Sequence, residues 1–171
     1  MLTKEQEEWI SHLSNERKIE ILPYNPAIKD IFEVIKKEIL DFLPEVNVLH
    51  RGSTALGILG QGEIDLYIPV LKKDFDNYLE KLINHFGEPG SLYHCKRARF
   101  VKYIDNIKIE IFLINEETND WKNSVKFENY LRKNKSALEK YEKLKQEANG
   151  LSVREYYRRK LEFISDLINI C

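Results

Sequence analysis

Apolar residues along this chain change their spacing several times, and each change marks a predicted element. From Pro26 to about residue 42 they recur three and four positions apart, which predicts an amphipathic helix of about four turns that Pro44 ends. The same spacing predicts a short helix over residues 4–14. It also predicts a helix after Asp74, whose side chain is expected to cap it.

Strict alternation of apolar and polar residues marks strands instead. The clearest strand runs from Glu63 to Val70. Residues 91–104 and 107–114 form two more strand-like runs, joined at Asp105-Asn106, a pair typical of a tight hairpin turn. A short strand is expected from Val46 to Leu49.

After Asn115 the chain is rich in helix formers. Residues 120–148 predict helix, and Ser152-Val153-Arg154-Glu155 matches a capping box that opens a last helix to about Ile170. This order predicts an α+β (mixed α/β) fold in which helices flank a mixed sheet and the C-terminal part is helical. We expect one domain over residues 1–171, made of a helical extension (1–18), an α/β core (19–115) and a helical tail packed on the core (116–171).

Composition and charge narrow the classes of protein. The chain has 171 residues, 43% of them hydrophobic, which excludes a disordered protein. The net charge of −1 provides no overall field that attracts nucleic acid or membrane. No apolar run is long enough for a membrane helix, and the polar N-terminus does not resemble a signal peptide. With two cysteines, Cys95 and Cys171, expected as reduced thiols, the sequence predicts a cytoplasmic protein.

Three carboxylates are the candidate centre of a site. In a strand, alternate residues share a face, so Glu63 and Asp65 point one way, and Glu110 occupies the corresponding face of a later strand. If the two strands are neighbours, the three groups converge. Clustered carboxylates repel unless a cation lies among them, and oxygen ligands suit Mg²⁺. Because alternating polar residues are common on a solvated face, the Glu-x-Asp pair alone would not indicate a site.

Residues that precede this strand are candidates for phosphate binding. Gly52 allows the backbone to approach a ligand closely, and Ser53, together with neighbouring amides, suits the β- and γ-phosphates. Thr54 belongs to the same segment. His50 is expected either to contact a phosphate or base, or only to brace the turn.

Basic residues supply further candidates. Arg97 and Arg99 share a strand face and are expected to support a triphosphate, although basic residues on an edge strand also serve to prevent aggregation. The last helix carries a second basic group. We expect it to be a solvated face, with RNA or a polyphosphate as the alternative ligand. Its members are Arg154, Arg158, Arg159 and Lys160.

Gly52-Ser53 followed after a gap by Glu63-Ile64-Asp65 resembles the signature of the nucleotidyltransferase superfamily that includes DNA polymerase beta. The chain is more closely similar to the GrpB-like family of that superfamily. The segments that carry this similarity are Pro23-Tyr24-Asn25-Pro26, His50-Arg51-Gly52-Ser53-Thr54, Phe127–Arg132, Tyr141–Lys145, and the closing helix with Tyr157, Lys160 and Phe163. The resemblance covers residues 19 to about 168 and implies a mixed sheet flanked by helices.

This chain departs from the usual pattern of that family at two places. Gln61-Gly62-Glu63 stand where a Lys-Pro pair usually precedes Ile-Asp, so the usual lysine is absent while Glu63 restores the first acid of the superfamily signature. Glu110 stands where many family members carry histidine. These departures predict a more catalytic site than in most relatives.

The expected activity is Mg²⁺-dependent transfer of a nucleoside monophosphate from a nucleoside triphosphate, with ATP foremost, to an acceptor hydroxyl. Glu63, Asp65 and Glu110 would hold the metal, and Glu110 is the expected proton acceptor. The acceptor is left open among a small molecule, a protein and RNA, and no membrane partner or oligomeric state is predicted. Two alternatives stay open, namely a non-catalytic nucleotide- or coenzyme-A-related binding module and a protein-interaction scaffold.

Overall fold

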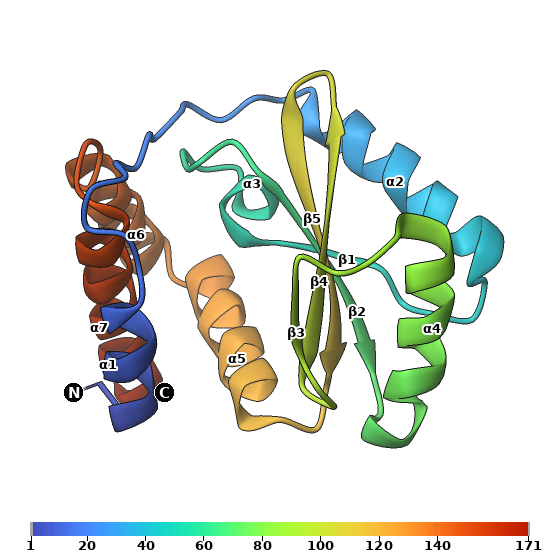
Figure 1. Ribbon diagram of the computed structural model, residues 1–171. Coiled ribbons are helices and arrows are strands. Elements are labelled where there is room, and N and C mark those ends of the chain that lie inside the picture. The colour runs from blue at the N-terminus through green and yellow to red at the C-terminus, as the bar shows by residue number, and fades with distance from the viewer. Residues whose placement is uncertain (1, 171) are drawn as a thin grey trace. The chain divides into compact units, whose positions relative to one another are not determined.

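The computed structural model describes residues 2–170, with side chains described to residue 168 (Figure 1). The helices are α1 (Lys4–Ser11), α2 (Ile28–Phe42), α3 (Gly52–Leu56), α4 (Phe75–Phe86), α5 (Asn119–Lys133), α6 (Lys135–Glu147) and α7 (Val153–Ile170), with a 3-10 turn η1 (Lys72–Asp74). The strands are β1 (Leu49–Arg51), β2 (Ile64–Val70), β3 (Ser91–Tyr93), β4 (Arg97–Ile104) and β5 (Ile107–Asn115).

The chain divides into two compact units, and each is described by itself. The first contains residues 1–24, 58–61 and 123–171, and the second contains residues 25–57 and 62–122. The sheet and all three candidate carboxylates lie in the second unit. The expected packing of a helical tail on the α/β core stays a prediction.

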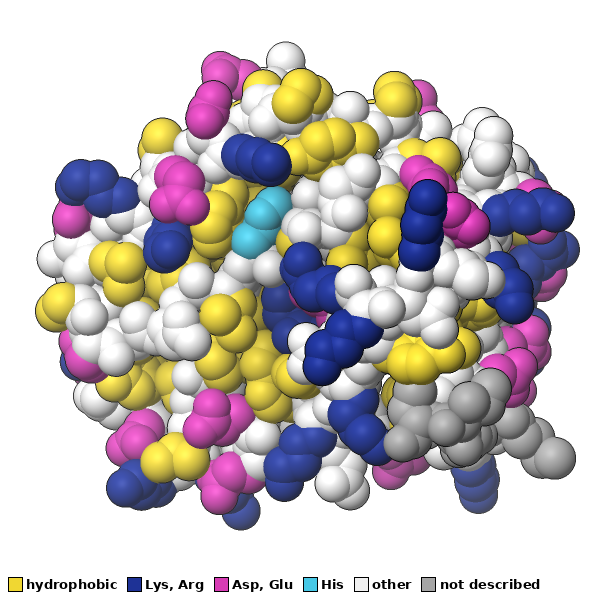
Figure 2. All heavy atoms as spheres, turned by 180° about the vertical axis from the view of Figure 1, so that it is seen from behind, with side chains coloured by type: hydrophobic (Ala, Val, Ile, Leu, Met, Phe, Trp, Pro, Cys, Tyr) yellow, Lys and Arg dark blue, Asp and Glu magenta, His cyan; other side chains and the backbone are white. Residues whose placement is uncertain are grey.

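Charged side chains of both signs are interspersed on the face seen in Figure 2, with apolar side chains between them. This pattern agrees with the small net charge of −1. Within residues 2–170, no helix has both the length and the apolar character that crossing a membrane requires.

A mixed five-stranded sheet forms the second unit, in the order β1-β2-β5-β4-β3. β2 and β5 run parallel, and the other neighbouring pairs are antiparallel. The expected turn between β4 and β5 is confirmed, because Asp105 and Asn106 both have positive φ, 48° and 64°, as a tight hairpin turn requires. The mixed α+β architecture predicted from the sequence is therefore present.

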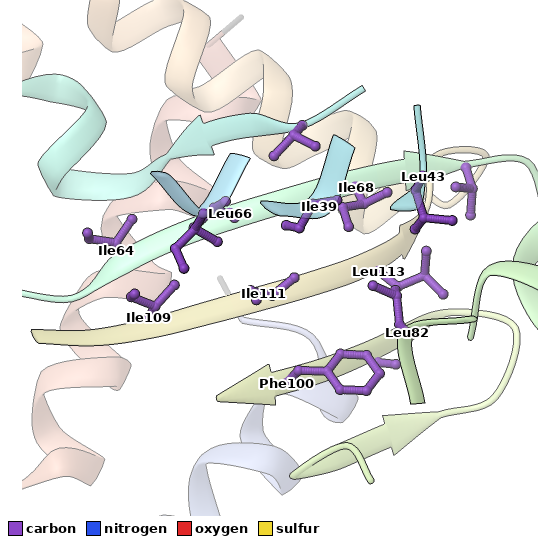
Figure 3. Packing of buried hydrophobic residues seen from close by; sticks show 14 of the residues in the cluster. Ile39, Leu43, Ile64, Leu66, Ile68, Leu82, Phe100, Ile109, Ile111 and Leu113 are labelled. Carbon is purple, nitrogen blue, oxygen red and sulfur yellow. The ribbon is translucent and has the colours of Figure 1, made fainter. Parts of the chain in front are cut away.

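Helices α2 and α4 pack on one face of this sheet (Figures 1 and 3). Alternate residues of β2 are buried, as Ile64, Leu66 and Ile68 show, and the corresponding residues of β5 pack beside them. Burial of each such side chain contributes roughly 1.5–3 kcal/mol. The alternation leaves the other face of β2 and β5 for the polar residues, and this is the face that carries the candidate site.

Four local predictions differ from the structure. β1 comprises Leu49–Arg51 rather than residues 46–49, because Val48 is buried in the core outside the strand ladder. The run 91–104 is broken by a turn at Cys95, which has a positive φ of 55°. Residues 120–148 form two helices, because the side chain of Asn134 accepts a hydrogen bond from the Ala137 amide and caps α6. Asp74 precedes α4, but its side chain makes no cap hydrogen bond.

In the first unit, the N-terminal helix α1 packs against α7 through basic residues. Arg154 donates to the carbonyls of Ser11 and Leu13, and Arg158 pairs with Glu7 at 2.9 Å. Ser152 Oγ accepts a hydrogen bond from the Glu155 amide, which is the N-cap half of the capping box predicted at the start of α7. Two of the four basic residues, expected to form a solvated face with RNA or polyphosphate as the alternative ligand, therefore link α7 to residues 7–13.

Candidate functional site

The three predicted carboxylates converge on the sheet face opposite α2 and α4. Asp65 of β2 stands directly beside Glu110 of β5 in the parallel register. One carboxylate oxygen from each of Glu63, Asp65 and Glu110 lies within 4.8 Å of the other two. Glu110 is buried, whereas Glu63 and Asp65 are partly accessible. The alternation of strand side chains therefore predicts this geometry correctly, while the metal-binding role stays a prediction.

Lys108, which shares a strand face with Glu110, also belongs to this cluster, although no role was predicted for it from the sequence. Its Nζ lies 2.7 Å from Glu110 Oε1 and 2.8 Å from Glu63 Oε1, so the ammonium bridges two of the three carboxylates. Burial lowers the pKa of Lys108, but hydrogen bonds to Glu110 and Glu63 outweigh it and the net pKa is raised. The signal was present, because Lys108 is two residues before Glu110 and shares its strand face.

Of the two predicted arginines, Arg99 reaches the carboxylates and Arg97 does not. Arg99 Nη1 donates to Glu110 Oε1 at 3.1 Å, while its Nε is buried and has no hydrogen-bond partner among the described residues. Arg97 lies instead over the rings of Tyr93 and Phe112, at 5.0 and 5.9 Å from their centroids. Both arginines are on β4, an internal strand paired with β3 at these positions, so edge protection does not account for them.

Gly52 is fixed by its closeness to Asp65. Its φ is +79°, and a Cβ added there would lie 2.4 Å from Asp65 Oδ2. Only glycine combines this backbone conformation with so close an approach. The expected role of Gly52 in close backbone approach is therefore visible here, with the Asp65 carboxylate as the neighbour.

His50 and Thr54 form a chain of hydrogen bonds that ends at the Glu63 backbone. Thr54 Oγ1 donates to the Glu63 carbonyl at 3.1 Å and lies 2.9 Å from His50 Nε2. Because the single hydroxyl hydrogen goes to Glu63, His50 Nε2 must be the donor to Thr54. His50 pairs with Leu66 in register and stacks on Phe32 at 4.7 Å, which places its ring on the core face.

These hydrogen bonds position the backbone of Glu63. The His50 ring lies on the core face and does not reach the carboxylates. Thr54 is buried, and its hydroxyl is used within the protein. Ser53 lies in the first turn of α3 and is partly buried. Ligand contacts of His50, Ser53 and Thr54 stay predictions.

Next to the carboxylates, aromatic rings continue along the same sheet face. Tyr67 stacks on Phe112 with centroids 4.7 Å apart and lies 5.5 Å from Trp121. The Arg51 guanidinium lies over Trp121 at 4.8 Å. Phe112 and Trp121 are buried, so the row provides apolar packing beside the carboxylates. The aromatic row could have been predicted from strand alternation, because Tyr67 is two residues after Asp65 and Phe112 is two residues after Glu110.

The donor set fits a hard divalent cation. Around Mg²⁺, with bonds of about 2.1 Å, neighbouring ligand oxygens lie about 3 Å apart and opposite ones about 4 Å apart. Separations of up to 4.8 Å among the three carboxylates need only a small closure to reach that range. Lys108 has to leave its bridging position first, because it uses oxygens of Glu63 and Glu110.

Comparison with known proteins gives three results. The model of the family described as GrpB protein matches residues 18–169. The UPF0157 protein of Vibrio cholerae is 22% identical over 147 residues, which cover 85% of this chain and 78% of that protein. The crystal structure of the conserved protein GrpB from Enterococcus faecalis has a TM-score of 0.61 at 20% identity and covers 87% of this chain and 94% of that one. The family match spans nearly the whole sequence, and we conclude that this chain belongs to the GrpB family.

Proposed function

We propose that this chain is a Mg²⁺-dependent nucleotidyltransferase that moves a nucleoside monophosphate from a nucleoside triphosphate, ATP foremost, to an acceptor hydroxyl. The observation that carries the proposal is the convergence of Glu63, Asp65 and Glu110 on one sheet face. When bound, Mg²⁺ would neutralise the charge of the triphosphate and align it for reaction. The superfamily resemblance of the Gly52-Ser53 and Glu63-x-Asp65 segments supports the same activity.

Several residues have separate tasks in this proposal. Glu63 and Asp65, which are partly accessible, present oxygens to the metal from one side, and buried Glu110 completes the set. Arg99 supplies positive charge, and its unpartnered buried Nε is a donor that a phosphate oxygen can satisfy after a small movement.

The proposed reaction is a single displacement. The acceptor oxygen attacks the α-phosphorus, a new P–O bond forms, the bond to the β-phosphate bridging oxygen breaks, and pyrophosphate leaves. The acceptor proton passes to a carboxylate of the site or to water. Glu110 was the expected proton acceptor, but its Oε1 already accepts hydrogen bonds from Arg99 and Lys108. Asp65 is more accessible and is the better candidate for this task.

The first experiment is calorimetric titration of each nucleoside triphosphate, with and without Mg²⁺, into wild type and Asp65→Asn. The substitution removes one negative charge and keeps the shape of the side chain. Asp41→Asn is the matched control, because Asp41 is an exposed aspartate on α2 that pairs with Lys37. The proposal expects Mg²⁺-dependent binding in wild type and in Asp41→Asn, and its loss in Asp65→Asn.

Absence of triphosphate binding in wild type at millimolar concentration would overturn the proposal. Binding without turnover would not establish the reaction, so the second step measures pyrophosphate release with mixed small-molecule, protein and RNA acceptors. Release that requires Mg²⁺ and Asp65 would support transfer.

The bridging position of Lys108 favours one alternative, a non-catalytic module that binds an anionic nucleotide without metal. In that case the ammonium is a permanent cation of the site, and it meets the phosphates directly. Lys108→Met separates the two functions. The transferase predicts unchanged or tighter Mg²⁺ binding in this variant, whereas the binding module predicts loss of nucleotide binding that Mg²⁺ does not restore.

A further inference from the structure

A second group of metal-ligating side chains lies in the second unit, away from the three carboxylates. Asp76 is in the first turn of α4, and His94 and Cys95 are in the turn that joins β3 to β4. Cys95 Sγ lies 3.0 Å from His94 Nδ1, and His94 Nε2 lies 3.4 Å from Asp76 Oδ1. One ligand atom from each of the three lies within 4.8 Å of the other two.

Cys95 occupies a backbone position that does not suit it. Its φ is +55°, in a three-residue connection closed by the Lys96 amide donating to the Tyr93 carbonyl at 2.9 Å. Glycine or asparagine is the usual residue at such a position, because a side chain is strained there. A strained residue with a chemically distinctive side chain is a pointer to function.

The turn is also anchored from beneath by Asn115. This residue is buried at the end of β5. Its side-chain Nδ2 donates to the Cys95 carbonyl at 2.9 Å, and its backbone N–H donates to the Lys96 carbonyl at 2.9 Å. The backbone that carries the thiol is therefore held in place before any ligand arrives. Such preorganisation lowers the entropy lost on binding.

A thiolate, an imidazole and a carboxylate together select a borderline divalent metal such as Zn²⁺ rather than Mg²⁺. With Zn–S of about 2.3 Å and Zn–N and Zn–O of about 2.0–2.1 Å, tetrahedral ligand atoms lie about 3.3–3.6 Å apart. The side chains of His94 and Asp76 are 70% and 66% exposed, so they can rotate to this geometry without disturbing the core. His94 would coordinate through one of its two ring nitrogens.

We propose that Asp76, His94 and Cys95 form a Zn²⁺ site with three protein ligands, whose fourth position is open to water or a small anionic ligand. Asn115, which anchors the turn, is five residues beyond Glu110 on β5, or about 16 Å along the strand. The two clusters are therefore separate, and this site does not depend on the proposed transferase activity.

The test uses the full chain under reducing conditions and two probes, Zn²⁺ followed by competition with a chromophoric chelator and Co²⁺ followed by its thiolate charge-transfer absorption. Wild type is expected to bind one Zn²⁺ at this site and to show the cobalt–thiolate band. Cys171→Ser is the matched control, because it removes the other cysteine of the chain and should keep the band. Cys95→Gly should lose it.

Cys95→Gly suits the positive φ of this turn, so loss of the band in this variant is not a failure to fold. His94→Gln and Asp76→Asn, at exposed positions, should each weaken Zn²⁺ binding. Asp65→Asn should leave the cobalt–thiolate band unchanged, which separates this site from the carboxylates. Absence of the band in wild type, or its persistence in Cys95→Gly, would overturn the proposal.

Discussion

Lys108 Nζ lies 2.7 Å from Glu110 Oε1, and the same ammonium reaches Glu63 at 2.8 Å. Glu63 and Glu110 are two of the three carboxylates of the proposed metal site, so the protein places its own cation where a metal would bind. A metal ion and Lys108 therefore compete for the same oxygens.

Replacing Lys108 with methionine should make this competition measurable. The variant keeps most of the apolar stem and removes the charge, which leaves Glu63 and Glu110 without their shared partner. We expect its free energy of unfolding in metal-free buffer to fall by about 1–3 kcal/mol. We also expect its affinity for Mg²⁺ to rise by roughly tenfold, since a favourable competitor worth about 1.4 kcal/mol is removed.

Urea unfolding with and without Mg²⁺ checks both expectations. Lys37→Met is the control, because Lys37 pairs with Asp41 on the exposed face of α2 and should change neither quantity appreciably. Weaker Mg²⁺ binding in Lys108→Met than in wild type would contradict the competition.

Gly52→Ala should damage both the fold and the site. The added Cβ meets Asp65 Oδ2, and the residue keeps a φ of +79° that costs an alanine about 1–2 kcal/mol. Overpacking against Asp65 adds about 1–3 kcal/mol. Gly57→Ala is the matched control, with a φ of +71° and nothing within 4 Å of its Cβ, so it should show only the backbone cost.

Urea denaturation measures the free energy of unfolding of both variants. The difference between Gly52→Ala and Gly57→Ala gives the cost of the close approach to Asp65. Equal destabilisation by the two substitutions would mean that Asp65 moves aside freely. Triphosphate binding should be lost in Gly52→Ala and retained in Gly57→Ala if Asp65 must stay where it is.

Acid should weaken the contacts that Glu38 makes on the other side of the sheet. Burial raises the pKa of Glu38, but hydrogen bonds from Lys102, at 2.6 and 2.7 Å, and from His85 outweigh it and hold the pKa below its usual 4.5. A carboxyl with a depressed pKa stabilises the folded protein above the unfolded value. That contribution is lost as the pH falls from about 4.5 through the lowered folded value.

Measuring the free energy of unfolding across this pH range tests the Glu38 contribution. Glu38→Gln should flatten the pH dependence, while Glu33→Gln, an exposed change on the same helix, should keep the wild-type slope. An unchanged slope in Glu38→Gln would show that the Lys102 contact contributes nothing in solution.

Cys95→Gly should stabilise the metal-free protein. The residue has a φ of +55°, so glycine relieves strain of about 1–2 kcal/mol against an entropic cost of about 0.5–1 kcal/mol. We expect a net gain of about 0.5–1 kcal/mol in chelator-treated samples. Cys95→Ala removes the thiol but keeps the strain, so it should show no such gain in thermal unfolding.

Much of the site was predictable because a strand side chain has only two directions. Alternation places Glu63 with Asp65 on one face and Glu110 on the corresponding face of its own strand, while their convergence depended on β2 and β5 being neighbours, as the structure shows. Lys108 follows from the same rule, but its effect depends on a long flexible side chain that turns toward the carboxylates. Sequence patterns do not determine that direction.

The misplaced elements have a different physical cause. Cys95 interrupts a strand-like run at a position where glycine or asparagine would have indicated a turn, so the hairpin was not visible in the sequence. Asn134, by contrast, is a recognisable N-cap residue, and it could have indicated the start of α6. For His50 the sequence left two roles open, and the structure shows the one that braces the turn, through the contact of its Nε2 with Thr54 Oγ1.

The way the chain is threaded through its two units has a consequence for synthesis on the ribosome. The second unit needs only residues 25–57 and 62–122, so all of its strands are available before residues 123–171 are made. The first unit joins residues 1–24 to residues 123–171, as in the Ile19 amide that donates to the Leu151 carbonyl at 2.9 Å. Helix α1 must therefore wait for α7, and the nascent chain carries its carboxylate-bearing sheet before α1 has this partner.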